Sequence, residues 1–301
     1  MKVIWMFENS FASAVAMAAH RALIYEVLTA PKPGLVDRFG SGAHEDMDVF
    51  SFVDSAGAIL PYLYHCAKTG QEFKAEPANL LKKLRPAGLE AEKAMLEATG
   101  GVNTHKGAVF SMGLICAAAG VCGETASAED ICIMAGRIAA PATEDFAASD
   151  AAPETAGERL HASAGLCGVR GEAAAGFPSI RETALPAMRE ALKAGKSIND
   201  AAVLSLAKLI LRAEDTTFIK RCAGRDPRPY LESVEKALTA ENPIEALAET
   251  DRLWSAAGLS AGGCADLLAL TLFLHFFCNA KKTDRYGSYA KGQYNKTRKH
   301  P

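Results

Sequence analysis

Apolar residues recur along most of the chain at the three- and four-residue spacing of an amphipathic helix, whereas the period-two alternation of a half-buried strand is almost absent. Alanine is abundant throughout. These patterns predict an all-α protein, a single large multi-helix domain with Gly-rich functional loops between its helices. We expect helices near residues 9–29, 46–68, 79–98, 106–120, 128–140, 180–194, 199–213, 229–239, 243–256 and 263–280.

The predicted organisation is one all-helical domain over residues 1–280, followed by a polar, basic tail over residues 281–301 that we expect to be poorly ordered. A chain of 301 residues can bury a large core without disulfides or structural metals. We find no repeat of fixed period and no inter-domain linker, so a helical solenoid is not indicated.

Charge and hydrophobicity exclude several classes of protein. The 33 Lys and Arg residues are balanced by 35 Asp and Glu residues, whereas nucleic-acid and polybasic membrane binding require excess positive charge. The most hydrophobic window, Leu267 to Phe277, is too short to span a bilayer and predicts a buried core helix. The eight cysteines are scattered and include no C-x-x-C pair, and the N-terminus does not resemble a signal peptide. We therefore expect a cytoplasmic protein with reduced thiols. We expect neither nucleic-acid nor membrane partners.

The first of four long connections brings three carboxylates close together in the sequence. It contains two motifs, Pro31-Lys-Pro-Gly-Leu-Val-Asp-Arg38 and Gly42-Ala-His-Glu-Asp-Met-Asp48. Asp37, Asp46 and Asp48 accompany His44, and crowded oxygen ligands suit Mg²⁺ bridging to substrate phosphates. The alternative is a helix start, where Asp is favoured by the helix dipole. The sequence leaves both interpretations open.

The second and third connections carry basic residues among glycines. The second is Gly100-Gly-Val-Asn-Thr-His-Lys-Gly107, which opens an apolar helix. His105 and Lys106 there can bind phosphate or transfer a proton, although the motif alone is weak and a C-cap formed by Gly100 explains the glycines more simply. In the third, Gly157-Glu-Arg-Leu-His161 precedes Arg170 and Glu172. Arginine suits bidentate phosphate binding, and the alternative is an Arg–Glu pair that fixes the loop.

The fourth connection combines a carboxylate, hydroxyl groups and positive charge at a helix end. The carboxylate of Asp215 and the hydroxyl groups of the two threonines that follow it can bind a metal or a ribose. Lys220 and Arg221 come next in the sequence. A fifth element, at residues 259–268, starts the last helix, where Ser260 and the glycines can bind an anion. We expect Asp266 in the first turn of that helix, where a carboxylate interacts favourably with the helix dipole. Together these loops predict a helical enzyme that acts on a nucleotide or similar polyphosphate with Mg²⁺.

Taken together, the motifs resemble the triphosphoribosyl-dephospho-CoA synthase family (CitG/MdcB) from about residue 20 to about residue 275, in the family's order. Ala261 and Cys264 stand where that family usually has Pro and Ser, and Thr217 stands where Asn is common. A run that begins with Lys220 replaces His-Arg-Gly-Gly. The matching motifs are Pro31–Asp37, Gly42–Asp48, Gly100–Gly107, Gly157–Arg159, Arg170–Glu172, Asp215–Thr217 and Gly262–Leu268.

The resemblance implies an all-α enzyme that joins two substrates, ATP and 3′-dephospho-CoA. It releases adenine and leaves the 5-triphosphoribosyl group on the 2′-hydroxyl of dephospho-CoA. The product is the prosthetic-group precursor for the acyl carrier protein of citrate lyase or malonate decarboxylase, and it passes to a holo-acyl-carrier-protein synthase. The sequence is compatible with a homodimer and does not decide between the two pathways.

Site roles follow from the resemblance as hypotheses. Asp37 or Glu172 serves as general base, and His44 or His105 protonates adenine. Asp46, Asp48 and Asp215 hold Mg²⁺ on the triphosphate. The residues that bind the phosphates and the rest of the substrates are Lys32, Arg38, Asn103, Lys106, Arg170, Lys220, Arg221 and Ser260.

Two alternatives from other classes are kept. A Mg²⁺-dependent hydrolase of nucleotides or ADP-ribose-like compounds would use the same carboxylates to activate water, and would release adenine or phosphate without an acceptor. A catalytically silent helical binding protein would bind the ligand without turnover. The presence of nearly all the charged loop residues disfavours the second alternative.

Overall fold

The computed structural model describes residues 10–142 and 168–279, so the predicted tail and the motif at 157–161 lie outside the described residues. Within those ranges the chain forms helices and loops without a strand, apart from an isolated antiparallel bridge between Asp37 and Gly40. The all-α prediction is therefore confirmed. The helices are α1 (Ser10–Leu28), α2 (Val49–Glu72), the 3₁₀ turn η1 (Pro77–Asn79), α3 (Leu80–Ala98), α4 (Lys106–Cys122), α5 (Ala128–Ala139), α8 (Gly168–Ala174), the π-helical segment η2 (Ser179–Ala184), α9 (Leu185–Lys193), α10 (Ile198–Arg212), α11 (Thr216–Cys222), α12 (Arg228–Leu238), α13 (Pro243–Ala256) and α14 (Gly262–Asn279).

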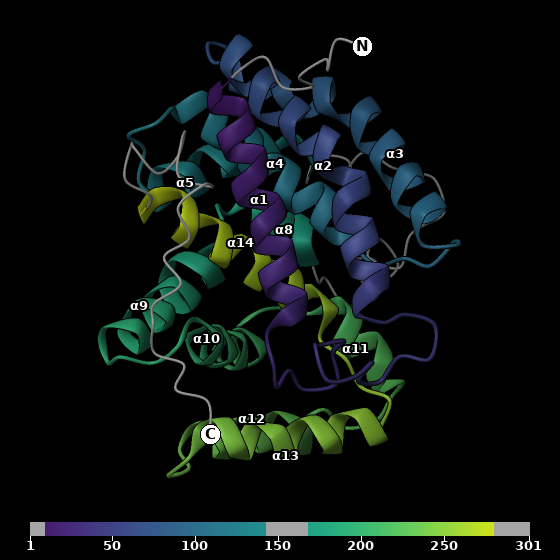
Figure 1. The fold of residues 1–301 in the computed structure, drawn as a ribbon. Helices are drawn as coiled ribbons and strands as arrows, with labels where there is room; N and C mark the ends of the chain where they lie inside the picture. The colour runs from purple at the N-terminus through teal and green to yellow at the C-terminus, as the bar shows by residue number, and fades with distance from the viewer. Residues whose placement is uncertain (1–9, 143–167, 280–301) are drawn as a thin grey trace, which may run out of the picture.

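Helix α14 runs through the middle of the molecule, where α1, α10 and α4 pack against it (Figure 1). On one side α1, α2 and α4 form a tight group, with α3 against α2 and α5 against α4. Small residues allow the close approach of α2 and α4, because a Cβ on Gly70 would lie 2.1 Å from the carbonyl oxygen of Ala117. On the other side α10 contacts α9, α12 and α14, and α12 pairs with α13.

Two helices, α1 over Phe11–Leu28 and α14 over Gly262–Asn279, are long and apolar enough to cross a membrane by length and composition alone. This corrects the expectation based on the shorter window at Leu267–Phe277. About half of each window is buried inside the protein, 50% and 56% respectively. The central position of α14 confirms that this window forms a core helix (Figure 1).

Most of the predicted helices are present, and the differences have local causes. Helix α2 begins at Val49 rather than near residue 46, because Asp48 and Ser51 form a capping box at its N-terminus. The predicted helix at 180–194 is divided into η2 and α9. Helices α8 and α11 were predicted as loops; each has 7 residues, too few to show a helical period.

Candidate active site

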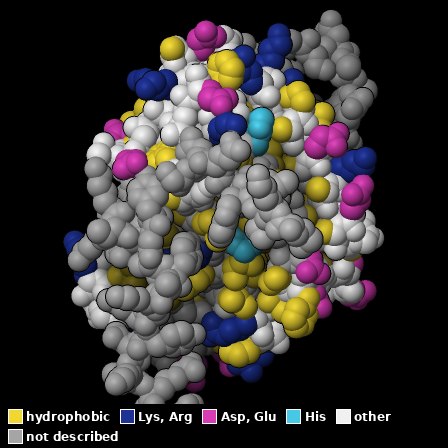
Figure 2. All heavy atoms as spheres, turned by 45° about the horizontal axis from the view of Figure 1, so that its top comes forward, with side chains coloured by type: hydrophobic (Ala, Val, Ile, Leu, Met, Phe, Trp, Pro, Cys, Tyr) yellow, Lys and Arg dark blue, Asp and Glu magenta, His cyan; other side chains and the backbone are white. Residues whose placement is uncertain are grey.

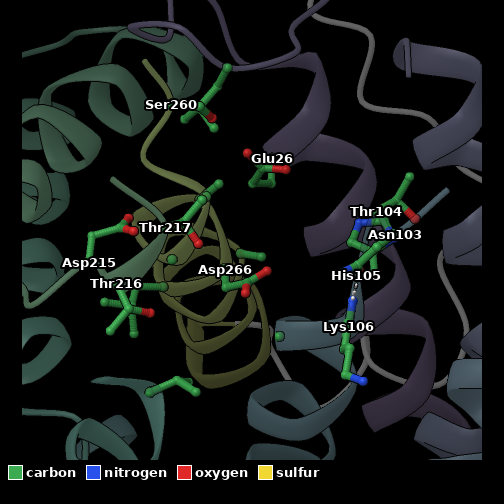
Figure 3. A pocket seen from close by; sticks show the side chains of 18 of the residues that line it. Glu26, Asn103, Thr104, His105, Lys106, Asp215, Thr216, Thr217, Ser260 and Asp266 are labelled. Atoms are coloured by element: carbon green, nitrogen blue, oxygen red, sulfur yellow. Dashed lines mark hydrogen bonds between the residues drawn. The ribbon is translucent and has the colours of Figure 1, made fainter. Parts of the chain in front are cut away.

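A cavity of about 990 Å³ lies between α1, α4, α8, α11 and the start of α14. Segments far apart in the sequence meet here, as the close-up in Figure 3 shows for residues near 104, 216 and 266. Most of the predicted site residues line this cavity. They are Lys32, His44, Asn103, His105, Lys106, Arg170, Glu172, Asp215, Lys220, Arg221 and Ser260.

Two predicted residues of the first connection shape that loop and do not line the cavity. The buried Asp37 carboxylate accepts hydrogen bonds from the backbone N–H of Phe39 at 2.7 Å and of Gly40 at 3.2 Å. The Arg38 guanidinium donates to the Leu28 carbonyl at 2.9 Å and to the Asn199 side chain at 2.7 Å. Both side chains therefore hold the chain in place rather than meeting a ligand in this cavity.

The three carboxylates predicted to hold Mg²⁺ do not converge. Asp46 is exposed, and Asp48 is the N-cap of α2, where its carboxylate accepts from the backbone N–H of Ser51 at 2.9 Å. Asp215 alone of the three lines the cavity. The parts of the chain that the structure describes contain no group of three or more His, Cys, Asp or Glu side chains able to hold a metal ion. For Asp48 the geometry therefore corresponds to the helix-start interpretation.

Asp215 joins the N-termini of two helices. It is the N-cap of α11, accepting from the backbone N–H of Phe218 at 2.9 Å, and its other oxygen accepts from the N–H of Cys264 in α14 at 2.8 Å. Burial raises the pKa of this carboxyl, and these hydrogen bonds oppose the rise. The Asp-Thr-Thr motif thus starts a helix, which corrects its predicted place at a helix end.

His44, Arg221 and Ser260 form a connected network in the cavity wall. Arg221 donates to His44 Nδ1 at 3.1 Å, and His44 Nε2 lies 3.0 Å from the Ser260 hydroxyl. Because a guanidinium can only donate, Nδ1 must be the acceptor and the imidazole proton is on Nε2. Burial, followed by the Arg221 charge, lowers the pKa of His44. His44 is therefore held as a neutral imidazole.

His105 precedes α4 and is almost completely buried. Its Nδ1 lies 2.6 Å from the Ser55 hydroxyl, and the ring meets Phe52 edge-on with 5.0 Å between the ring centroids. Burial, with a smaller effect from the Lys32 charge, lowers the pKa of His105 to about 3. Its Nε2 is buried and has no hydrogen-bond partner within the described ranges. The second connection thus supplies a neutral imidazole with an unsatisfied nitrogen.

The Gly-rich start of this connection is explained by helix termination. Gly100 adopts a φ of +65°, and the N–H of Gly101 bonds to the Leu96 carbonyl at 2.7 Å, closing the end of α3. The C-cap interpretation of Gly100 is confirmed. Farther along, the exposed Lys106 ammonium lies 3.0 Å from the Glu92 carboxylate.

Lys32 forms a buried ion pair with Glu26 of α1, and both side chains are nearly inaccessible to solvent. The Lys32 ammonium also donates to the Glu26 backbone carbonyl at 2.9 Å. Burial raises the pKa of Glu26, and Lys32 lowers it. Although Lys32 lines the cavity, its charge is already engaged by a carboxylate.

Glu172 lies on α8, although the sequence predicts a loop there. Its carboxylate accepts from the backbone N–H of Ser179 at 2.8 Å and from the Ser179 hydroxyl at 3.2 Å. Burial raises the pKa of Glu172. Arg170 is on the same short helix, and Lys220 is exposed on α11. Glu172 is therefore a fixed carboxylate with a raised pKa, and it shares the cavity with several basic groups.

Sequence reasoning gave Glu26 no role and assigned Asp266 only a dipole role, yet both line the cavity. Glu26 lies within a continuous helical pattern, so nothing distinguished it from a surface glutamate. Asp266 did have a signal, because it is a carboxylate that directly precedes the most hydrophobic window of the chain, Leu267–Phe277. Figure 3 shows its side chain at the centre of the labelled residues, with Glu26 above and His105 and Thr217 on opposite sides.

Comparison with known proteins identifies the family. The family model described as CitG, ATP:dephospho-CoA triphosphoribosyl transferase, matches residues 12–285. The chain belongs to this family. The 2-(5''-triphosphoribosyl)-3'-dephosphocoenzyme-A synthase of Pectobacterium atrosepticum is 40% identical over 262 residues, which cover 85% of this chain and 86% of that protein.

More distant members of the family are also similar. A probable synthase of the same description from Lactiplantibacillus plantarum is 37% identical over 268 residues, 85% of this chain and 94% of the relative. Protein CitXG of Leuconostoc mesenteroides subsp. cremoris is 36% identical over 279 residues, 87% of this chain and 58% of its own length. No solved structure matches the chain significantly.

Proposed function

We propose that this member of the family transfers the 5-triphosphoribosyl group of ATP to the 2′-hydroxyl of 3′-dephospho-CoA and releases adenine. The observation that carries the proposal is the convergence of the family's motifs. The segments around Lys32, His105, Asp215 and Ser260 come from separate connections and line one cavity. The volume of about 990 Å³ is at the upper end of ordinary ligand sites, which suits two nucleotide substrates.

The cavity contains groups suited to both substrates. Lys106, Lys220 and Arg221 bring positive charge toward the anionic phosphates, and guanidinium and ammonium groups bind phosphate well. Glu172 is the proposed general base for the incoming 2′-hydroxyl, because it lines the cavity and burial raises its pKa, which makes its carboxylate a stronger base. Asp37 does not line the cavity and is not assigned this role.

Mg²⁺ enters the proposal as part of the substrate, MgATP. The trio of Asp46, Asp48 and Asp215 does not converge into a resident site. Mg²⁺ that is already bound to a triphosphate keeps several waters and needs few protein ligands. The proposed residue roles therefore do not depend on a resident metal.

The product is proposed to be the prosthetic-group precursor for the acyl carrier protein of citrate lyase or malonate decarboxylase, handed to a holo-acyl-carrier-protein synthase. We also propose a cytoplasmic location. Balanced charge supports it, as do the cysteines that the structure describes, which are free thiols. On the face shown in Figure 2, Lys and Arg side chains are interspersed with Asp and Glu.

Product analysis tests the proposed function. The protein is incubated with ATP, Mg²⁺ and 3′-dephospho-CoA, and the products are separated by chromatography and weighed by mass spectrometry. We expect one adenine for each dephospho-CoA that gains the mass of a triphosphoribosyl group. Adenine or phosphate formed without any dephospho-CoA adduct would contradict the transfer and support the hydrolase alternative.

A further inference from the structure

We propose that the carboxyl group of Asp266 is the acid that protonates adenine as it leaves. The inference rests on the proposed function, because it assigns one proton transfer within that reaction. It begins from the position of a single side chain in the first turns of α14.

Asp266 projects into the cavity at the junction of α14 and α4. A Cβ built on Gly107 in the first turn of α4 would lie only 2.0 Å from Asp266 Oδ2. The carboxyl group therefore occupies space that any larger residue at position 107 would fill. Asp266 is partly exposed, and it lines the cavity. Figure 3 shows it facing the space in front of His105.

Within the described ranges the Asp266 carboxyl has no hydrogen bond or ion pair, unlike the buried carboxylates Glu26 and Asp215. Lys32 is bound to Glu26, and Asp215 is bound by backbone N–H groups. Burial, followed by the charges of Glu26 and Asp215, raises the pKa of Asp266 well above its usual value. The other titratable or charged groups that line this cavity are Glu26, Lys32, His44, Glu92, His105, Lys106, Arg170, Glu172, Glu214, Asp215, Lys220 and Arg221.

These surroundings favour the protonated carboxyl, which is a proton donor. A carboxylic acid kept neutral by burial and by neighbouring carboxylates can act as a general acid. The two histidines expected to protonate adenine are poor donors in comparison. The pKa of His105 is lowered to about 3, and that of His44 is also lowered while its Nδ1 accepts from Arg221. Of these three residues, Asp266 is thus the one whose protonated form is favoured and can donate a proton to adenine.

The proposed step balances protons and electrons. As the C1′–N9 bond of ATP breaks, its electron pair moves into the purine, and the Asp266 proton passes to a ring nitrogen of adenine. The 2′-oxygen of dephospho-CoA bonds to C1′ and gives its proton to Glu172. Proton exchange with solvent then restores Asp266 and Glu172, so the net change is transfer of one proton from the acceptor hydroxyl to adenine.

A leaving group that needs no proton separates this role from a structural one. N7-methylated ATP carries a cationic purine that departs as a neutral molecule. We expect Asp266→Asn to slow adenine release from ATP by about 10²–10⁴-fold, the usual contribution of a general acid. With N7-methylated ATP we expect wild type and Asp266→Asn to release 7-methyladenine at rates within about tenfold.

The matched control is Asp54→Asn, an exposed aspartate on α2 outside the cavity, which should behave as wild type with both nucleotides. An equal loss of rate by Asp266→Asn with both nucleotides would overturn the proposal, as would full activity with ATP. So would a wild-type enzyme that transfers from ATP but not from the methylated nucleotide.

A wild-type measurement keeps the test valid even if Asp266→Asn fails to fold. With ATP, kcat should fall with rising pH as Asp266 loses its proton, and with N7-methylated ATP that fall should be absent. An identical alkaline limb with both nucleotides would exclude Asp266 as the acid. If wild type makes no adduct from ATP at any pH, the proposed function fails, and that outcome is distinct from failure of the Asp266 role.

Discussion

The carboxyl group of Asp266 fills the position at which a side chain on residue 107 would begin. The Cβ of any residue replacing Gly107 would lie 2.0 Å from Oδ2 and 3.1 Å from Cγ of Asp266. The first turn of α4 therefore meets α14 at Asp266, which lies in the second turn of α14 and not in its first turn as the sequence predicts. The absence of a side chain at 107 leaves the acid directed into the cavity.

Gly107→Ala should separate activity from stability. The new methyl group must displace the end of the Asp266 side chain, and helical alanine is favoured over glycine by about 1 kcal/mol. We therefore expect an unchanged or slightly higher Tm, while adenine release falls by about 10²-fold or more, in line with loss of an acid. Gly57→Ala, in open space on α2, is the control and should keep full activity. Full activity in Gly107→Ala would contradict the placement of Asp266.

The buried pair of Lys32 and Glu26 should show strong coupling in stability. Lys32→Met leaves an uncompensated carboxylate at a site only 3% exposed, which should destabilise the folded state by about 3–5 kcal/mol in urea unfolding. Combining it with Glu26→Leu should recover most of that loss, because the buried charge is then removed. Additive losses in the double variant would show that the two residues do not act as a pair.

His105 should make the protein less stable in acid. Its pKa falls from 6.5 to about 3 in the folded state, so between these values the unfolded chain binds a proton that the folded chain does not. The contribution of neutral His105 to the free energy of unfolding is complete above the pKa of the unfolded chain. It is lost as pH falls from that value toward the pKa of the folded state. His105→Asn should therefore reduce the slope of unfolding free energy against pH, between about pH 6 and 4, by up to about 1.4 kcal/mol per pH unit. An unchanged slope would show that His105 titrates normally.

Substitutions of Asp48 distinguish a helix cap from a metal ligand. Asp48→Asn keeps a capping side chain and should preserve both stability and activity, whereas Asp48→Ala should cost about 0.5–2 kcal/mol of stability. Activity is measured as adenine release over a range of Mg²⁺ concentrations. A large rise in the Mg²⁺ requirement of Asp48→Asn would restore the metal-ligand hypothesis.

The fold was largely predictable because helical periodicity is a local property. Long helices such as α1, α10 and α14 were found close to their observed bounds, and the capping box of Ser127 and Asp130 is present at α5. Helices α8 and α11 were missed because each spans 7 residues. Asp215 and Gly168 at their starts are equally typical of loops.

The site was predictable only as a set of segments. The motifs identified which connections matter, but they did not distinguish side chains that face the cavity from those that hold the loop. Asp37 and Arg38 adjoin cavity residues in sequence, yet they bond to Phe39 and Leu28. The importance of Asp266 depends on a tertiary contact with Gly107, and local sequence carries no such information.

The most direct test of the account is the dependence of adenine release on the acceptor. The initial rate of adenine formation from MgATP is measured for the wild-type protein with and without saturating 3′-dephospho-CoA. The account predicts adenine at a catalytic rate only when dephospho-CoA is present. Equal rates in both reactions would contradict it, because water rather than the 2′-hydroxyl would then be the nucleophile in this cavity.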